Sequence, residues 1–372
     1  MIAVSSHSSD LCRAVENISA QDGLVGYRNV VSYVAALGLP VLPRTAMDEA
    51  TWKWLGTGSF STTFEGSVYH HGTASVVAIK QPNSPLVRDK TEVESRVQHL
   101  ALSSMIQECR ILADPKLRSH PNLPHLMAVY FQEERGVQGV RPCLVMELAV
   151  SDFRGFLEAH APEGRGATEL ARACSQIANG LCALHAYGLV HGDVKPENVL
   201  MFRRGDVLVA TVADLGTCGI QGQSEPVVGT AAFWAPELHA KSSFRDSATR
   251  SSRDVYSFGL VVYAAVTCYR EKPFPMPVEE QCRLQHEDAE CLGRLLSKMP
   301  QNSGADRLLR EVVSRCVRSD PDRRPSIFEV CRMLEEFLGD SRFGPTQPQC
   351  PFPSCGYNPT SMMWSADTCS VC

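Results

Sequence analysis

Apolar and polar positions alternate in several segments of the first 150 residues, and this pattern predicts β-strands. Bulky residues alternate over 52–55, and β-branched and aromatic residues are dense over 62–69 and 75–80. Glycines at positions 56 and 58 separate the first two segments, and two more apolar runs cover 126–131 and 142–146. We therefore expect an antiparallel sheet of about five strands.

Helical periodicity separates the third strand from the fourth and then dominates the rest of the chain. The segment 92–112 carries apolar residues at helical spacing, namely Val93, Val97, Leu100, Ala101, Met105, Cys109 and Leu112. Further helices are expected over 168–187, 254–266 and 325–338. The helix over 254–266 is apolar around most of its circumference, which is typical of a buried central helix. The pattern therefore changes from strands to helices along the chain.

Composition and charge exclude several classes of protein. The chain is 44% hydrophobic and 21% charged, close to an ordinary globular protein. Its net charge is −5 without a basic run, so nucleic acid is not an expected partner. The apolar run 255–266 is too short to span a bilayer, and residues 1–10 lack the regions of a secretory signal. Several of the 15 cysteines fall on apolar helical faces, so we expect a reduced, cytoplasmic setting.

The two ends of the chain differ from its middle. Residues 1–48 form an N-terminal extension with a short helix expected over 25–39 and no assigned chemistry. Residues 341–372 are rich in proline and cysteine, and we expect them to be disordered. Two alternatives remain for this tail. Cys350, Cys355, Cys369 and Cys372 could bind zinc, or the last four residues could direct lipidation of Cys369. Lipidation is the only route to a membrane that the sequence offers.

The segment His191–Leu200 carries the residues best suited to chemistry. Asp193, Lys195 and Asn198 interrupt apolar residues, and Pro196 breaks any α-helix there. An Asp can accept a proton, a Lys can balance phosphate charge, and an Asn can bind a metal ion through its amide oxygen. The alternative is a charged surface turn.

A second candidate site lies at the glycines between the first two strands. Glycine lets backbone N–H groups approach phosphates closely, and Lys80 ends the third strand. Most Gly-x-Gly segments are simple turns, but this position between strands favours a phosphate site. Glu108, on the flank of the predicted helix, is either a surface residue or a partner of Lys80.

Taken in order, these segments resemble the eukaryotic protein kinase family. The matching motifs are Gly56–Phe60, Val77–Lys80, Glu108, His191–Asn198, Asp214–Gly216, Ala235–Glu237, Asp254–Gly259 and Arg324. The resemblance implies an α+β, bilobal fold, in which a small antiparallel β-sheet lobe with one helix is followed by a larger, mainly helical lobe. The kinase domain would cover 49–340, with lobes at 49–148 and 149–340. Residues 254–259 are similar to those of the tyrosine-kinase-like group.

The resemblance also assigns roles to individual residues. Asp193 would accept the proton of the substrate hydroxyl, with Lys195 and Asn198 as the other catalytic residues. Asn198 and Asp214 would hold Mg²⁺. The positions implied to contact ATP are Leu55, Gly56, Thr57, Gly58, Ser59, Phe60, Ser61, Thr63, Ala78, Lys80, Glu108, Met146, Glu147, Ala149 and Leu200. Glu237 is expected to pair with Arg324.

Three details refine the implied function. Lys195 two residues after Asp193, and the pair Gly229-Thr230, favour serine/threonine rather than tyrosine specificity. Gly192 replaces the arginine that in the family pairs with a phosphorylated activation loop. We therefore expect no buried cation there, and activity without phosphorylation of Thr217, Ser224 or Thr230. The alternative function is a nucleotide-binding pseudokinase scaffold, which the presence of every charged catalytic residue disfavours.

Overall fold

The computed structural model describes residues 33–70, 73–83, 92–133, 140–160, 166–223, 229–239, 250–270 and 272–339. These residues form two compact units. Among these residues, the sheet unit contains those up to Arg118 together with His125–Leu148, and the helical unit contains Ser119–Pro124 and those from Ala149 to Gly339. Of the helix predicted over 25–39, residues 33–36 are helical and 25–32 lie outside the described residues, as does the tail 341–372.

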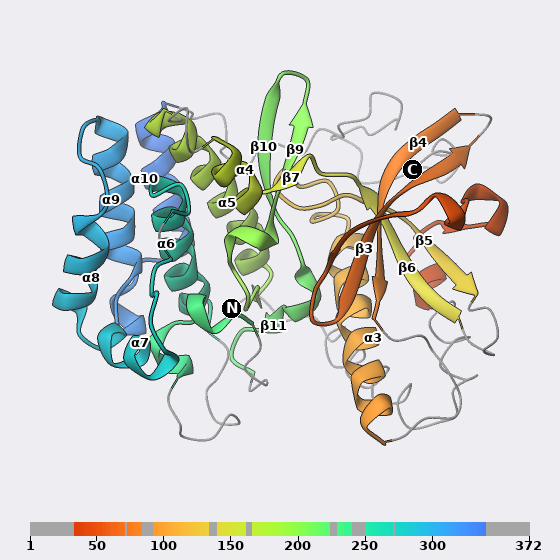
Figure 1. Cartoon of the computed structure of the whole chain (residues 1–372), viewed down its shortest axis with the longest axis horizontal. Coiled ribbons are helices and arrows are strands. Elements are labelled where there is room, and N and C mark those ends of the chain that lie inside the picture. The colour runs from red at the N-terminus through yellow and green to blue at the C-terminus, as the bar shows by residue number, and fades with distance from the viewer. Residues whose placement is uncertain are drawn as a thin grey trace. The chain divides into compact units, whose positions relative to one another are not determined.

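The sheet unit contains the five predicted antiparallel strands (Figure 1). They are β2 (Lys53–Thr57), β3 (Ser61–His70), β4 (Thr73–Pro82), β5 (Leu126–Glu133) and β6 (Val140–Glu147). A sixth strand, β1 (Val41–Leu42), pairs in parallel with β5 at the edge of the sheet. The prediction was wrong in leaving this strand out, because two residues are too short to show a period of two.

One long helix, α3 (Glu92–Ala113), packs along the sheet and contacts β4 and β5 (Figure 1). Its predicted apolar face is confirmed at Ala101, Met105, Cys109 and Leu112, which are all buried. Among the side chains of this face that the structure describes, which exclude Val93 and Val97, the exception is Leu100, which is 53% exposed. On a 3.6-residue helix its neighbour Ala101 faces the core, so Leu100 is turned away from it.

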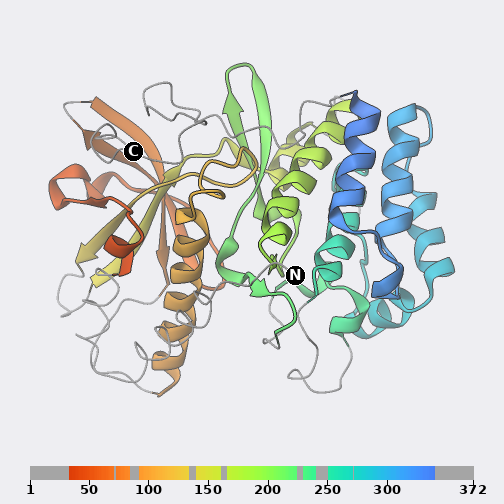
Figure 2. The same ribbon diagram turned by 180° about the vertical axis from the view of Figure 1, so that it is seen from behind.

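The helical unit is built around one central helix. Its helices are α4 (Phe153–His160), α5 (Ala167–Ala186), α6 (Ser252–Val266), α7 (Val278–Gln285), α8 (Asp288–Ser297), α9 (Gly304–Cys316) and α10 (Ile327–Leu338). Every residue from Arg253 to Ala265 is buried, which confirms the prediction for the segment 254–266. Helix α10 packs on α5 and α9 packs on α6 (Figure 1 and Figure 2).

Short strands and 3₁₀ turns hold the polar segments of the helical unit. A three-stranded sheet contains β7 (Ser151–Asp152), β9 (Val199–Arg204) and β10 (Val207–Val212), and β8 (Leu189–Val190) pairs with β11 (Gly219–Ile220). The 3₁₀ turns are η3 (Pro196–Asn198), η4 (Leu215–Thr217), η5 (Ala231–Phe233), η6 (Pro236–Leu238) and η7 (Pro321–Arg323) here, and η1 (Arg44–Ala46) and η2 (Glu49–Thr51) in the sheet unit. The candidate catalytic segment therefore runs from β8 to β9.

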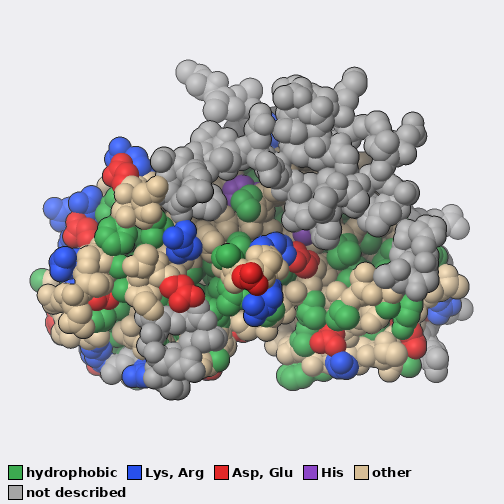
Figure 3. Space-filling model, turned by 90° about the horizontal axis from the view of Figure 1, so that it is seen from above, with side chains coloured by type: hydrophobic (Ala, Val, Ile, Leu, Met, Phe, Trp, Pro, Cys, Tyr) green, Lys and Arg blue, Asp and Glu red, His purple; other side chains and the backbone are tan. Residues whose placement is uncertain are grey.

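Two general features concern the surface and the cysteines. None of the described helices has the length and apolar character needed to cross a bilayer. Acidic and basic side chains lie next to one another on the face shown in Figure 3. Cys109, Cys174 and Cys331 are buried as predicted from their helical faces, whereas Cys182 is only half-buried.

Candidate active site

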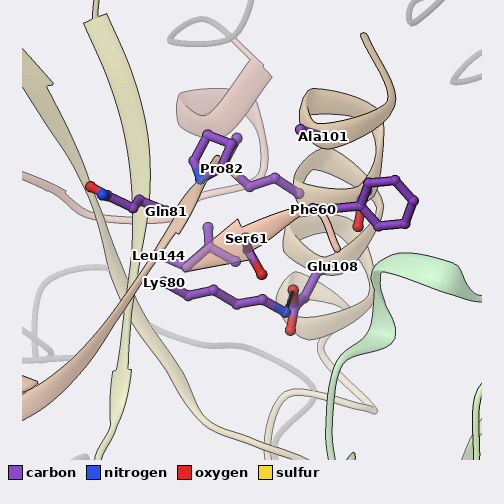
Figure 4. Close-up of a pocket in the computed structure, with 10 residues that line it drawn as sticks. Phe60, Ser61, Lys80, Gln81, Pro82, Ala101, Glu108 and Leu144 are labelled. Carbon is purple, nitrogen blue, oxygen red and sulfur yellow. Dashed lines mark hydrogen bonds and ion pairs between the residues drawn. The ribbon is translucent and has the colours of Figure 1, made fainter. Parts of the chain in front are cut away.

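In the sheet unit, Lys80 and Glu108 form a largely buried ion pair. The Nζ of Lys80 on β4 lies 2.6 Å from the Oε2 of Glu108 on α3, and their side chains are 15% and 2% exposed. Figure 4 shows the two side chains pointing toward each other. Of the two interpretations of Glu108, the structure therefore supports the partner of Lys80. The carboxylate fixes the long lysine stem, which would otherwise sample several rotamers.

The strand register aligns several predicted ATP contacts. Gly56 on β2 is opposite Thr63 on β3, and Thr63 is opposite Lys80 on β4. In the next pair of strands, Ala78 is opposite Met146. Side chains of directly opposed residues lie on the same face of a sheet. Register alone therefore places these residues in two neighbouring rows within the sheet unit.

The glycine-rich bend is held by a residue that the sequence analysis missed. The amide nitrogen of Asn83 donates to the carbonyl of Gly58 at 2.9 Å and to that of Ser59 at 3.3 Å. The backbone N–H of Asn83 donates to the carbonyl of Phe60 at 2.9 Å. These bonds hold the carbonyls of Gly58, Ser59 and Phe60 against Asn83, and the N–H of Gly58 donates to the carbonyl of Ser61 at 2.7 Å. The signal was available, because Asn favours such side-chain bonds to turn backbone.

A small pocket surrounds the Lys80–Glu108 pair (Figure 4). Its lining residues are Phe60, Ser61, Lys80, Gln81, Pro82, Ala101, Ser104, Met105, Glu108 and Leu144. Four of the predicted ATP contacts line it, whereas Leu55, Ala78, Met146 and Glu147 do not. Leu55 is half-exposed on β2, and Gly56 and Thr57 continue that strand. The pocket is therefore a separate feature from the row that contains Ala78 and Met146.

In the helical unit, Asp193 lies at the centre of a hydrogen-bond network. Its Oδ2 accepts from the Nζ of Lys195 at 2.7 Å and from the Nδ2 of Asn198 at 3.0 Å. Its Oδ1 accepts from the backbone N–H of Thr230 at 2.8 Å. These three donors fix the orientation of the carboxylate.

Lys195 links the catalytic segment to Thr230. Besides Asp193, its Nζ contacts the Oγ1 of Thr230 at 2.7 Å. Thr230 therefore contacts both charged residues, with its hydroxyl on Lys195 and its backbone N–H on Asp193. Ala149 and Leu200 also lie in this unit, where Val150 donates to the carbonyl of Met201 at 2.9 Å.

Gly229 allows the chain before Thr230 to pass close to Gly192 and Asp193. Its φ is +113°, and a Cβ at this position would lie 2.8 Å from the carbonyl oxygen of Gly192 and 3.0 Å from the Oδ1 of Asp193. We expect Gly229→Ala to lower the free energy of unfolding by about 2 kcal/mol or more, because it adds a clash to an unfavourable φ. Urea titration measures this loss.

The control for this substitution is Gly205→Ala. Gly205 has a φ of +60°, but a Cβ there would meet no atom within 4 Å. Its loss of stability should reflect the backbone strain alone and stay near 1 kcal/mol. An equal loss at both positions would show that the close approach of Gly229 to Gly192 has no energetic consequence.

Asp254 holds the backbone that precedes Asp193. Its Oδ2 accepts from the N–H of His191 at 2.7 Å, and its Oδ1 accepts from the N–H of Gly192 at 2.9 Å. The Nε2 of His185 lies 2.9 Å from the same Oδ2. Burial alone would raise the pKa of Asp254, but His185, His191 and Arg253 outweigh it and hold the pKa below its ordinary value. The ionised carboxylate therefore fixes the catalytic segment on α6.

Asn198 and Asp214 are neighbours that could hold a cation. The N–H of Ala213 donates to the carbonyl of Asn198 at 2.9 Å, which brings the following residue, Asp214, beside Asn198. Both side-chain bonds of Asn198 use its amide nitrogen, so the amide oxygen is left for other ligands. Asp214 has a left-handed backbone, with φ 62° and ψ 58°.

This donor set fits Mg²⁺, which takes one or two protein oxygens and completes its shell with water and phosphate. Within the described residues, no group of three or more His, Cys, Asp or Glu is arranged to hold a metal ion. A transition-metal site of that kind is therefore not part of the described structure. The four tail cysteines lie outside these residues.

One premise drawn from Gly192 is wrong. We expected no buried cation beside this residue, but a Cβ on Gly192 would lie 2.7 Å from the Nη2 of Arg253. Arg253 belongs to α6 and is buried. The sequence analysis missed it because residues 192 and 253 are far apart in the chain.

The expected pair of Glu237 and Arg324 is confirmed. Two guanidinium nitrogens of Arg324 contact the two carboxylate oxygens of Glu237, each at 2.7 Å. The same guanidinium donates to the carbonyls of Arg318 and Ser252. This bidentate pair joins η6 to the end of η7.

A comparison with protein families decides the identity of the fold. The model of the protein kinase domain matches residues 50–334. The chain belongs to the protein kinase family. The predicted fold class, α+β with a sheet region and a helical region, is confirmed as that of a protein kinase domain.

Relatives of this kinase domain differ in their reported specificity. The dual specificity protein kinase shkE of Dictyostelium discoideum is 30% identical over 204 residues, or 53% of this chain and 27% of that protein. The serine/threonine-protein kinase PkaA of Streptomyces coelicolor is 29% identical over 287 residues, 75% of this chain and 48% of that protein. The human dual specificity testis-specific protein kinase 2 is 25% identical over 320 residues, 84% and 48% respectively. The chain therefore spans half or less of the length of these relatives.

Proposed function

We propose that this kinase domain transfers the γ-phosphate of ATP to serine and threonine hydroxyls of a protein substrate. The observation that carries the proposal is the Lys195 ammonium, which contacts both Asp193 and Thr230 at 2.7 Å. Lysine at this position favours serine/threonine over tyrosine specificity. Its charge would offset the negative charge of the transferring phosphoryl group.

Asp193 is proposed to act as the base of the reaction. It accepts the proton of the substrate hydroxyl while the hydroxyl oxygen bonds to the γ-phosphorus, and the bond from that phosphorus to the β–γ bridging oxygen breaks. The products are a phosphoester and ADP. The hydrogen bonds from Lys195, Asn198 and Thr230 fix the carboxylate before the substrate binds.

The remaining charged residues are proposed to bind the nucleotide. Lys80 would contact the α- and β-phosphates, and Glu108 holds its ammonium group at 2.6 Å. Asn198 and Asp214 would hold Mg²⁺, which neutralises developing phosphate charge when bound. The oxygen ligands and the backbone bond between Ala213 and Asn198 support this assignment.

Transfer of label from [γ-³²P]ATP to a generic serine- and threonine-containing protein tests the proposal. Acid hydrolysis of the product identifies the labelled amino acids. Phosphoserine and phosphothreonine support the proposal, whereas phosphotyrosine beside them would make the enzyme dual-specific. Nucleotide binding without any transfer would instead support the pseudokinase alternative.

We also propose that transfer does not require phosphorylation of Thr217, Ser224 or Thr230. The support is local, because Thr217 and Thr230 already make their hydrogen bonds with unmodified hydroxyls, to His191 and Lys195. We expect phosphatase-treated protein, verified by intact mass, to keep its specific activity within about twofold, a change below 0.5 kcal/mol in barrier height. A loss of activity that returns on rephosphorylation would contradict this.

A further inference from the structure

Arg253 is a buried cation that the proposed transfer chemistry does not use. It lies in the first turn of α6 and is 8% exposed. Its guanidinium occupies the space beside Gly192, where any larger residue would place its Cβ 2.7 Å from Nη2 and 3.6 Å from Cζ. The carbonyl oxygen of Thr217 borders the same space, 3.2 Å from that Cβ position. The catalytic segment, η4 and α6 therefore meet at this guanidinium.

The guanidinium of Arg253 has no partner among the residues that the structure describes. Its Nε is fully buried without a hydrogen bond, and no ion pair or hydrogen bond joins the side chain to another described residue. A buried guanidinium nitrogen without an acceptor is unfavourable, even where a neighbouring carboxylate such as Asp254 offsets part of the charge. Arginine cannot reduce this cost by losing its proton.

The other buried arginine at this end of α6 shows the usual arrangement. Arg324 has a fully buried side chain, and Glu237 neutralises it through two bonds of 2.7 Å. Three backbone carbonyls, of Arg318, Ser252 and Ser319, take its other donors. The helical unit therefore pairs one buried guanidinium completely and leaves the other without a partner in its described part.

The carboxylates closest in sequence to Arg253 and Gly192, those of Asp254 and Asp193, already accept hydrogen bonds from other groups. Both oxygens of Asp254 accept backbone N–H groups, from His191 and Gly192. Both oxygens of Asp193 accept from Lys195, Asn198 and Thr230. No hydrogen bond or ion pair joins either carboxylate to Arg253. The negative charge of Asp254 lowers the cost of burying Arg253 but does not fill its donors.

We propose that Arg253, with Gly192 and Thr217 beside it, forms a binding site for a phosphate oxyanion. A guanidinium presents parallel N–H donors that match two oxygens of such an anion. Gly192 contributes by lacking a side chain, which leaves room for the guanidinium. The anion has two possible sources, inorganic phosphate from solution and a phosphoester on this chain. Occupancy stabilises the contact between α6, η4 and the catalytic segment, and the transfer step does not depend on it.

Thermal unfolding of the full-length, phosphatase-treated chain tests the site. Samples in sodium phosphate and in sodium chloride are compared at equal pH and ionic strength. We expect a Tm higher by about 2 to 4 °C when phosphate is tenfold above its Kd, and no such response in Arg253→Met. The Tm of Arg253→Met in chloride should stay close to that of the wild type, because the substitution removes no hydrogen bond or ion pair to a described residue.

The matched control is Arg250→Met, three residues earlier. Arg250 is half-exposed and pairs with Asp322 at 3.1 Å, so its loss removes the same charge without touching the site. This variant should keep the full phosphate response. An equal response in the wild type and in Arg253→Met would place phosphate elsewhere and overturn the proposal, and so would a wild type that does not respond.

A second comparison separates the two sources of the anion. The as-purified chain is weighed by intact mass and titrated with phosphate before and after phosphatase treatment. A response that appears only after a phosphoryl group has been removed assigns the site to a phosphoester of the chain. A response in both states assigns it to free phosphate. An Arg253→Met protein that unfolds far below the wild type in chloride would show a purely structural role and would also contradict the proposal.

Discussion

Asp193→Asn is expected to lower kcat for phosphoryl transfer by about 10²- to 10⁴-fold. The amide keeps the shape of the side chain but cannot accept a proton at neutral pH. It also places an NH₂ group where one carboxylate oxygen accepts from Lys195 and Asn198 or from Thr230. ATP affinity should change little, because Asp193 is assigned to the substrate hydroxyl. Steady-state kinetics and equilibrium nucleotide binding measure the two effects separately.

Asp206→Asn provides the control for this variant. Asp206 lies in the exposed turn between β9 and β10, so the same chemical change there should leave kcat unaltered. Circular dichroism and thermal unfolding show whether each variant is folded. If folded Asp193→Asn protein retained more than about a tenth of wild-type kcat, proton transfer to Asp193 would not limit catalysis.

Lys80→Met is expected to lower kcat by about 10²- to 10³-fold, because it removes a fixed positive charge from the proposed phosphate site. Unlike Asp193→Asn, it should also weaken ATP binding. The substitution leaves Glu108 without its ammonium partner at a position only 2% exposed, and the loss of one partner of a buried pair costs about 3 kcal/mol of unfolding free energy. Urea titration measures the loss of unfolding free energy, and equilibrium nucleotide binding measures the loss of ATP affinity.

The sheet unit supplies a close control in Lys53→Met. Lys53 contacts Glu65 at 2.7 Å, almost the distance between Lys80 and Glu108, but the Lys53 side chain is 74% exposed. An exposed pair of this kind contributes at most about 1 kcal/mol. A double-mutant cycle of Lys80→Met with Glu108→Gln isolates the coupling within the buried pair. Coupling no larger than that of the exposed pair would contradict a positioning role for Glu108.

The sequence predicts best those elements in which a repeating pattern is long enough to identify. The strands around Lys80 alternate over several residues, and the helix over 254–266 is apolar throughout, so both were located within a few positions. The segment His191–Leu200 was recognised because its polar residues interrupt a core, and the structure connects Asp193 with Lys195 and Asn198. In these cases local chemistry and burial lead to the same conclusion.

What the sequence did not predict depends on tertiary contacts that leave no local pattern. Strand β1 is two residues long and forms only because β5 offers an edge. Leu100 is apolar but points away from the core, since its neighbour Ala101 already fills that direction. Arg253 looked like an ordinary first-turn residue of α6. Only the fold shows that it lies against Gly192, 61 positions earlier (253 − 192).

The closeness of Gly192 and Arg253 has a consequence for engineering this domain. Introducing arginine at position 192, to restore the motif usual in the family, would bring a second guanidinium into space that the first one fills. It would also force a residue with a Cβ into a backbone conformation with φ near +83°. Positions 192 and 253 must therefore be substituted in the same variant. A protein with arginine at 192 needs a small neutral residue at 253.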